Sequence, residues 1–262
     1  MEGPRPSGGG KTMSDIPAYV IVGAAGGIGS ALCRRLAARG PCKLMLAGRD
    51  PNKLDALASD LTTAGATVAV RTLNAIDSGA VDLLFAEAGQ QFGPITGAAN
   101  LCGSILLKPA HLTTDQEFAD TLAVNVTTAF NVLRAAVKGM PNGGSVVLMS
   151  TVATKIGLAN HEAIAAAKGA VNGLVISAAA TYAGRNLRVN AVAPGLVRTP
   201  LAARLTSSEA TLKASTAMHP LGRIGEPGDV ADAIAWLLAP ETTWVTGQIV
   251  SVDGGLSSVR AK

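Results

Sequence analysis

The stretch Tyr19-Val20-Ile21-Val22-Gly23-Ala24-Ala25-Gly26-Gly27-Ile28-Gly29 decides the fold. Its apolar run has the character of a buried strand, the glycines that of a turn, and residues 28–39 that of a helix. Gly23 permits a tight turn, while Gly27 and Gly29 leave room for close approach of a pyrophosphate to the backbone. The free N–H groups at a helix N-terminus favour phosphate there. The stretch therefore predicts a dinucleotide-binding unit, against the alternative of an ordinary turn.

Short apolar runs and helix-periodic stretches alternate along the rest of the chain. The runs cover residues 19–22, 43–47, 67–73, 95–101, 145–149, 187–192 and 248–252, and the clearest helical stretches cover 28–39, 54–64, 115–138, 161–183 and 229–238. Strands that alternate with helices indicate βαβ units, and nearly continuous apolar strands indicate a sheet covered on both faces. We therefore predict an α/β fold, a doubly wound Rossmann-type parallel sheet of about seven strands with helices on both faces.

Length and composition define the domain organisation. The chain has 262 residues, of which 48% are hydrophobic and 15% charged, so a globular core is expected and global disorder is excluded. Residues 1–15 lack an apolar segment typical of a secretory signal, and we predict that they form a flexible leader. No composition shift divides the remainder, so residues 16–262 are expected to form a single domain that contains the dinucleotide-binding unit.

Charge, cysteines and hydropathy bear on partners and location. The net charge of +4 is scattered and aromatic residues make up only 3%, a composition atypical of nucleic-acid-binding proteins. Cys33, Cys42 and Cys102 form no C-x-x-C pair, so neither a disulfide framework nor a metal site is expected. We found no run of 18 apolar residues and expect no membrane span. These features predict a cytoplasmic protein whose partners are neither nucleic acid nor a membrane.

One predicted helix bears on assembly. Residues 163–183 have almost no polar face, so both sides of this helix need cover. One side can pack on the sheet, and a second subunit or a loop of the same chain can cover the other. We predict a homo-oligomer.

The end of the second predicted strand bears on the choice of cofactor. In dinucleotide-binding folds an acidic residue here selects NAD, whereas a nearby arginine accommodates the 2′-phosphate of NADP. This chain has Gly48 followed by Arg49, which favours NADP(H). The alternative is that Arg49 is a solvated charge and Asp50 serves as the acid.

Several motifs in order resemble the short-chain dehydrogenase/reductase family, in particular its ketoacyl-reductase-like members. They are Gly23-x-x-x-Gly27-Ile28-Gly29, Asn74, Asn100-Leu101-Cys102-Gly103, Asn125, Pro194-Gly195-Leu196-Val197-Arg198-Thr199, Gly222 to Pro227 and Val252-Asp253-Gly254-Gly255. The resemblance implies a homotetramer. Together with Arg49, it implies cofactor binding by Gly23, Gly27, Ile28, Gly29, Asn74, Asn100, Gly103, Lys168, Pro194, Gly195, Val197 and Thr199.

The catalytic motif departs from this resemblance. The family uses a Ser, a Tyr thirteen positions later and a Lys four positions after that. Lys168 matches the lysine, but Ile164 stands in place of the tyrosine and Thr151 in place of the serine. Thr151 can still donate a hydrogen bond to a substrate oxygen, and Lys168 can still hold the nicotinamide ribose. Asn125 matches the helix asparagine of the family's active site. Ile164 has no proton to donate.

Three functions are compatible with this site. The first is an NADP(H)-dependent oxidoreductase that transfers a hydride between nicotinamide and a small carbonyl or alcohol substrate, with another acid or water as proton source. The second is a repurposed site for imines, enones or a non-redox reaction. The third is a non-catalytic NADP-binding protein.

His161 is a candidate replacement for the missing acid. If the helix already includes residue 161, then 161, 164 and 168 share one face, and an imidazolium there can reach a substrate oxygen. The alternative is that His161 only precedes the helix, with its ring in solvent. The stretch 199–219 is expected to form a lid over the substrate, and its composition names no substrate class.

Overall fold

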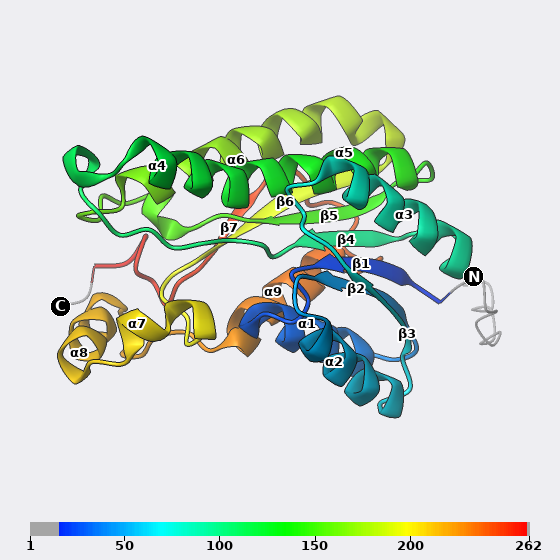
Figure 1. Ribbon diagram of the computed structural model, residues 1–262, viewed down its shortest axis with the longest axis horizontal. Helices are drawn as coiled ribbons and strands as arrows, with labels where there is room; N and C mark the ends of the chain where they lie inside the picture. Colours follow the sequence, from blue (N-terminus) through cyan, green and yellow to red (C-terminus); the bar gives the residue numbers. More distant parts are fainter. Residues whose placement is uncertain (1–15, 261–262) are drawn as a thin grey trace, which may run out of the picture.

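A seven-stranded parallel sheet with the order β3-β2-β1-β4-β5-β6-β7 forms the centre of the molecule (Figure 1). The computed structural model describes residues 16–260, so the predicted leader lies outside the described residues. The strands are β1 (Ala18–Val22), β2 (Lys43–Gly48), β3 (Thr67–Thr72), β4 (Gly97–Asn100), β5 (Gly144–Met149), β6 (Leu187–Pro194) and β7 (Ile249–Val252). All seven predicted runs are strands, which confirms the predicted fold class.

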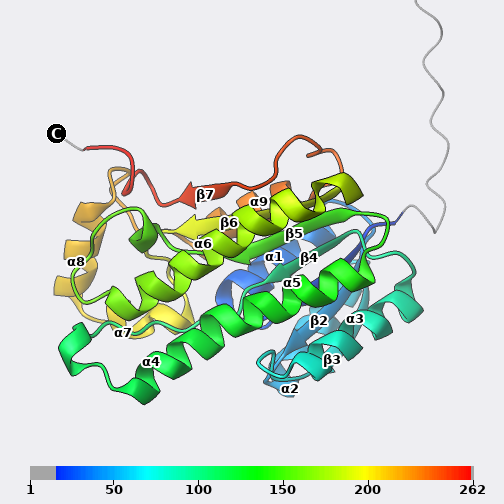
Figure 2. The same cartoon turned by 90° about the horizontal axis from the view of Figure 1, so that it is seen from above.

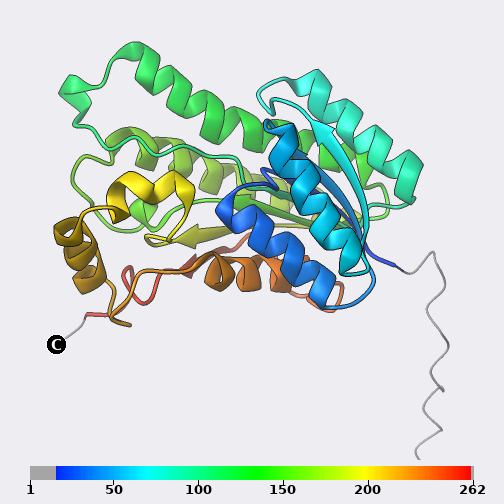
Figure 3. The ribbon, with the colours of Figure 1, turned by 60° about the horizontal axis from the view of Figure 1, so that its bottom comes forward.

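Helices cover both faces of this sheet. They are α1 (Gly27–Ala38), α2 (Pro51–Thr63), α3 (Ser78–Phe92), α4 (Asp115–Leu122), α5 (Thr128–Gly139), α6 (Glu162–Tyr182), α7 (Ala203–Thr206), α8 (Glu209–Met218) and α9 (Pro227–Leu238). Figures 1 and 2 show α3, α4, α5 and α6 on one side, and Figure 3 brings α1, α2 and α9 forward on the other. Short α7 and α8 lie beyond one end of the sheet.

The alternation of side chains along each strand builds two separate cores. In β1, Val20 and Val22 pack beneath α3, α5 and α6, whereas Tyr19 and Ile21 pack against α1, α2 and α9. Successive side chains of a strand point to opposite faces, so a fully apolar strand supplies both layers. This is why the central strands carry so few polar residues.

The glycine turn after β1 has the geometry that the sequence predicted. Gly23 adopts φ of +83°, and a side chain there would lie 2.9 Å from the backbone of Leu101. A Cβ on Gly29 would collide with the carbonyl oxygen of Gly23. The absence of side chains therefore lets the start of α1 pack directly against the turn.

Helix α3 was not among the helices singled out from the sequence. Its start is nevertheless encoded, because the Asp77 carboxylate accepts hydrogen bonds from the backbone N–H groups of Gly79 and Ala80. Its buried residues are Val81, Leu84, Phe85, Ala88 and Phe92, a spacing typical of one helix face. The sequence signal that was missed is therefore a capping Asp77 followed by apolar residues at helical spacing.

The predicted uninterrupted helix over residues 115–138 needs a correction. The chain is helical throughout, but a π-helical turn, Ala123–Thr127, separates α4 from α5. Asn125 lies within this turn, and its amide donates to the carbonyl oxygen of Thr121. A π-turn widens a helix locally and is frequent at functional sites.

Helix α6 is the long apolar helix expected from the sequence, although it begins at Glu162. The segment Glu162–Arg185 is long and apolar enough to cross a membrane by length and composition alone, a test that buried core helices also pass, and 44% of its most apolar window is buried inside the protein. In the fold, one stripe of this helix packs on β5 and β6. Its opposite face carries small exposed residues around Ile176.

Candidate functional site

A cavity of about 480 Å³ lies where several strands of the sheet end. Met149 at the end of β5 and Pro194 at the end of β6 line it, and so do residues of the segment 199–219. The strand order reverses between β1 and β4, and ligands of doubly wound sheets bind at such a switch point. The predicted lid segment therefore borders the cavity, as expected.

Lys168 is the charged group of greatest interest in this cavity. It projects from α6, is only 6% exposed, and forms no hydrogen bond or ion pair with any described residue. Burial lowers the pKa of Lys168 to about 8. A solvated surface lysine is thereby excluded. A buried ammonium without a partner is costly, which indicates that the site is built to receive a ligand.

The π-turn carries Asn125 into the wall of the cavity. Its amide group donates to the Ser104 hydroxyl at 2.9 Å, and its carbonyl oxygen accepts from the Ser104 N–H at 3.3 Å. These bonds fix the loop after β4 against the helix. A Cβ on Gly103 would lie 3.2 Å from the Asn125 oxygen and 3.7 Å from Lys168 Nζ, so a glycine keeps this corner open.

Thr151 and Ile164 occupy the positions that the family motif assigns to a hydroxyl and a phenol. Thr151 follows β5, and its side chain accepts a hydrogen bond from the Ala153 N–H at 3.3 Å. Its hydroxyl proton is left for a ligand. Ile164 is buried and also lines the cavity. The place of the missing phenol is thus an apolar wall beside an ammonium group.

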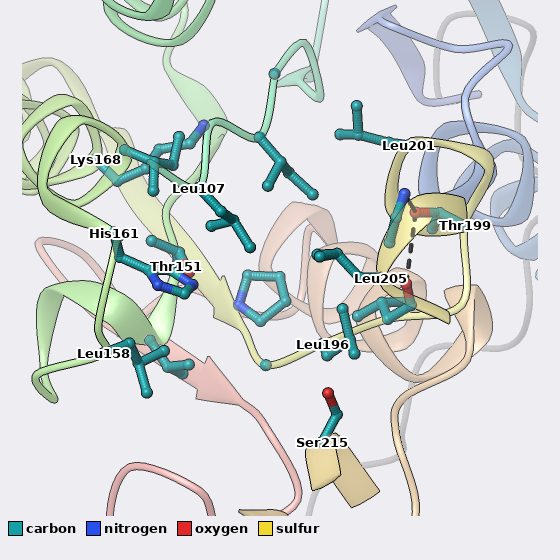
Figure 4. A pocket seen from close by; sticks show the side chains of 18 of the residues that line it. Leu107, Thr151, Leu158, His161, Lys168, Leu196, Thr199, Leu201, Leu205 and Ser215 are labelled. Atoms are coloured by element: carbon teal, nitrogen blue, oxygen red, sulfur yellow. Dashed lines mark hydrogen bonds between the residues drawn. The ribbon is translucent and has the colours of Figure 1, made fainter. Parts of the chain in front are cut away.

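His161 lines the same cavity. The prediction assumed that the helix already includes residue 161, and this assumption was wrong. Helix α6 begins one residue later, and His161 is its N-cap. Asn160, with a φ of +64°, turns the chain just before it. The Nδ1 atom lies 2.8 Å from the Ala159 carbonyl oxygen and must donate to it, which leaves Nε2 for another partner. Figure 4 shows His161 on the same side of the pocket as Thr151.

His219 is a buried site residue that the sequence analysis missed. It is 4% exposed and lines the cavity at the end of α8. Nδ1 lies 2.6 Å from the Ser215 carbonyl oxygen, and Nε2 accepts from the Leu196 N–H at 3.2 Å. A Cβ on Gly195 would lie 2.6 Å from Nε2. The ring therefore ties the lid to the Pro-Gly loop, and this glycine permits the contact.

The predicted cofactor residues surround this cavity or lie along the same edge of the sheet. Ile28, Gly103, Lys168, Pro194, Gly195, Val197 and Thr199 line the cavity. Gly27, in the glycine turn, lies close to one of these residues, since a Cβ there would lie 2.9 Å from the Thr199 methyl group. The turn, the Pro-Gly loop and Lys168, which has no partner among the described residues, thus fit a dinucleotide cofactor.

Arg49 and Asp50, the two candidates at the end of β2, differ in their surroundings. The Asp50 carboxylate caps α2 through the Lys53 N–H at 3.2 Å and also pairs with the Lys53 ammonium at 3.1 Å. These contacts lower the pKa of Asp50. Arg49 is exposed and makes no hydrogen bond or ion pair with any residue between 16 and 260. In the described part of the chain, the Asp50 carboxylate thus has Lys53 as its partner, whereas the Arg49 guanidinium has none.

Asn74 and Asn100 have different surroundings. Asn74 is exposed after β3, and its side chain accepts from the Ile76 N–H at 3.2 Å. Asn100 is buried at the end of β4, donates to the Thr128 hydroxyl at 3.0 Å and accepts from the Cys102 N–H at 3.3 Å. Its side chain is satisfied inside the protein, so it positions the loop that leads to Gly103.

Most of the cavity wall is aliphatic. Figure 4 shows Leu107, Leu158, Leu196, Leu201 and Leu205 around the space next to Thr151. These leucines come from the loops after β4, β5 and β6 and from the lid. A shielded site of this kind strengthens electrostatic interactions with Lys168, because the local dielectric is low.

Comparisons with known proteins agree with this geometry. The family model described as "Enoyl-(Acyl carrier protein) reductase" matches residues 23–257. Galactitol 2-dehydrogenase (L-tagatose-forming) of Cereibacter sphaeroides is 35% identical over 90% of this chain and 92% of its own length. Inactive 2-(S)-hydroxypropyl-CoM dehydrogenase 2 of Xanthobacter autotrophicus is 33% identical over 86% of this chain and 99% of its own length.

Solved structures show the same architecture. A point variant of actinorhodin polyketide ketoreductase, solved with NADPH, superimposes with a TM-score of 0.88 and 27% identity, covering 94% of this chain and 99% of that protein. The parallel sheet, the glycine turn, the lysine on α6 and these matches over nearly the whole chain lead to one conclusion. The protein belongs to the short-chain dehydrogenase/reductase family of oxidoreductases.

Proposed function

We propose that the protein is an NADP(H)-dependent oxidoreductase that transfers a hydride between nicotinamide and a carbonyl or alcohol substrate. The observation that carries this proposal is the buried Lys168 ammonium, unpartnered among the described residues, in a largely aliphatic cavity that the Thr151 hydroxyl also lines. A buried charge that is kept at a cost in stability is typical of a functional site.

The choice of NADP(H) rests on Arg49. Its guanidinium is exposed after β2 without an ion-pair partner among the described residues, while Asp50 caps α2. Arginine binds a phosphate through charge-assisted hydrogen bonds, and a 2′-phosphate distinguishes NADP(H) from NAD(H). The structural relative solved with NADPH is consistent with this choice.

The other residues proposed to contact the cofactor lie at or near the same edge of the sheet, where the strands end. Gly23, Gly27, Ile28 and Gly29 would hold the pyrophosphate, and Asn74 the adenine side. Gly103, held by Asn100, would lie next to the nicotinamide ribose together with Lys168. Pro194, Gly195, Val197 and Thr199 would hold the nicotinamide. Bound NADPH would supply the hydride for reduction of a carbonyl carbon.

Thr151 and Lys168 have complementary roles in this reaction. The Thr151 hydroxyl donates a hydrogen bond to the substrate oxygen and orients the carbonyl. Negative charge then develops on that oxygen, and the Lys168 ammonium stabilises it through a low-dielectric space. Asn125 holds the loop after β4 in position through Ser104. In the reverse direction the same groups stabilise the alkoxide formed from an alcohol.

His161 is the group that we propose as proton donor in place of a phenol. Its Nδ1 is engaged by Ala159, so Nε2 is the nitrogen that faces a ligand. Imidazole exchanges protons near neutral pH, and general acid catalysis contributes about 10²–10⁴-fold to a rate.

NADPH oxidation against ketones, imines, enones and quinones, with product analysis, tests the proposal. On the best carbonyl substrate, His161→Ala is expected to lower turnover at least about 100-fold and to change its pH profile. The exposed His111→Ala variant is the matched control, since His111 does not line the cavity. An unchanged pH profile in His161→Ala eliminates His161, and absence of NADPH oxidation with every substrate contradicts the redox function.

Reduction of an enone is the second candidate. Ile164 removes the phenol that carbonyl reduction uses in this family, whereas hydride addition to a β-carbon requires stabilisation of an enolate, which Thr151 and Lys168 can supply. The matching family model, described as an enoyl reductase, is consistent with this candidate. Saturated ketone as the product of an enone would distinguish it from the allylic alcohol formed by carbonyl reduction.

We also propose that the protein assembles as a homo-oligomer, a tetramer in the simplest case, in the cytoplasm. The outward faces of α5 and α6 expose Phe130 by 50% and Ile176 by 57%. A Cβ added to Gly169 or Gly173 on α6 would meet no atom within 4 Å, so another helix can approach closely there. A second copy of this chain is the partner we propose for this surface.

A further inference from the structure

The walls of the cavity point to a substrate class. The aliphatic side chains that define its outer part come from separate segments of the chain and include Ile105, Leu107, Leu158, Leu201, Leu205 and Met218. Among the described residues that line it, none is an Asp, Glu or Arg. Sugars and phosphorylated or sulfonated compounds are recognised by several such groups or by many hydrogen bonds, which this wall does not supply.

The polar groups of the cavity are concentrated and mostly occupied. Asn125 is bonded to Ser104 and Thr121, and both nitrogens of His219 are engaged within the protein. On the lid, the Thr211 hydroxyl donates to the Ser208 carbonyl oxygen at 2.9 Å. What remains for a ligand is the group of Thr151, Lys168 and His161 at one side, the proton of the Ser104 hydroxyl, and the Ser215 hydroxyl on the lid.

The aliphatic wall continues to the mouth of the cavity. Leu201 and Met218 line the cavity and are still 56% and 45% exposed, and Ile105 and Leu107 on the opposite loop are also partly exposed. Apolar side chains that gather at a rim lose contact with water when an apolar ligand covers them, and this burial favours binding.

We propose that the substrate is an uncharged compound with one carbonyl, or the corresponding alcohol, on a bulky apolar body. This inference rests on the proposed redox function and specifies its substrate. The carbonyl meets Thr151 and Lys168, and the apolar body fills the space between Leu107, Leu158 and the lid. In the reaction a hydride adds to the carbonyl carbon, the oxygen takes a proton, and NADPH is oxidised to NADP⁺.

Binding without turnover provides the decisive experiment. The methyl ketones 2-butanone, 2-hexanone, 2-octanone and 2-decanone, and the ketose fructose, are titrated calorimetrically into the protein with and without NADP⁺, which has no hydride to donate. Each buried methylene is expected to lower the Kd about threefold to fourfold, with fructose binding weakest. A Kd that does not fall along the series, or fructose binding more tightly than 2-decanone, overturns the proposal.

Two variants assign the effect to this wall. Leu107→Asn and Leu205→Asn place an amide of the same branched shape in the aliphatic surface, and each is expected to weaken 2-decanone binding at least about tenfold while NADPH affinity is unchanged. Leu83→Asn on α3, where the leucine is 55% exposed and does not line the cavity, is the matched control. Equal effects of all three substitutions contradict the proposed wall.

The outcome also separates this inference from the function on which it rests. Affinity that rises with chain length without NADPH oxidation contradicts the redox function and supports an apolar ligand site. NADPH oxidation with fructose and a flat ketone series supports the redox function and overturns the apolar substrate class.

Discussion

Replacement of Lys168 by methionine is expected to stabilise the cofactor-free protein while weakening cofactor binding. Burial holds the pKa of Lys168 at about 8, against 10.5 for an unperturbed lysine, and this difference corresponds to about 3 kcal/mol. Below pH 8 the folded protein carries a buried ammonium that the unfolded chain keeps in water. Methionine avoids this penalty at similar volume. At pH 7 the free energy of unfolding of Lys168→Met should therefore exceed that of the wild type by up to about 3 kcal/mol.

The difference in unfolding free energy between Lys168→Met and the wild type is expected to change with pH in one direction. Between pH 8 and pH 10.5 the unfolded chain binds more protons at this position than the folded chain, so the stability of the wild type rises with pH relative to the variant. The difference in stability between the two proteins should therefore disappear toward pH 10.5. Urea unfolding of both proteins at several pH values measures it, with Lys213→Met as the exposed-lysine control. A variant that is less stable at pH 7, or a gap independent of pH, would refute the unpartnered buried charge.

Four further outcomes are expected. Arg49→Ala should raise the Kd of NADPH about 10–100-fold and leave that of NADH within about twofold, measured by nucleotide fluorescence; equal losses for both would contradict the role of the arginine. Ile164→Tyr should raise ketone reduction at least about tenfold if the site is a weakened ketoreductase, and no gain would indicate a repurposed site. His219→Ala leaves the Leu196 N–H without its partner and should lower the free energy of unfolding by about 1–3 kcal/mol in urea, whereas His111→Ala should not. Phe130→Glu should lower the sedimentation coefficient to that of a smaller assembly, and a wild type that sediments as a monomer at micromolar concentration would contradict the oligomer.

The amino-acid sequence alone determined the fold class and much of the cofactor edge. Periodicity near two and near 3.6 separates strands from helices, and the apolar runs of the strands required helices on both faces. The glycine turn was predictable because a tight turn and close helix packing each exclude a side chain, as Gly23 and Gly29 show. The absence of a phenol at position 164 is also a property of the sequence.

Local chemistry that depends on a few hydrogen bonds was less accessible. The π-turn at Asn125 has no clear signature in the residue pattern, because it depends on bonds to Ser104 and Thr121 across the cavity edge. The start of α6 at Glu162, one residue after His161, depends on the left-handed turn at Asn160. The exact residue at which a helix begins is determined by such contacts more than by the periodicity of the sequence.

Only the tertiary structure showed what kind of surface the segment 199–219 offers to a substrate. In the sequence, residues 199–219 are polar and alanine-rich and name no ligand. Folding turns Leu201, Leu205 and Met218 toward the same space as Leu107 and Leu158, which are far away in the chain, so that scattered aliphatic residues become one wall. It also gives His219 two partners, Ser215 on α8 and Leu196 in the loop after β6. Amino-acid composition counts side chains but does not say where they point, whereas a binding site depends on which side chains point into the same space.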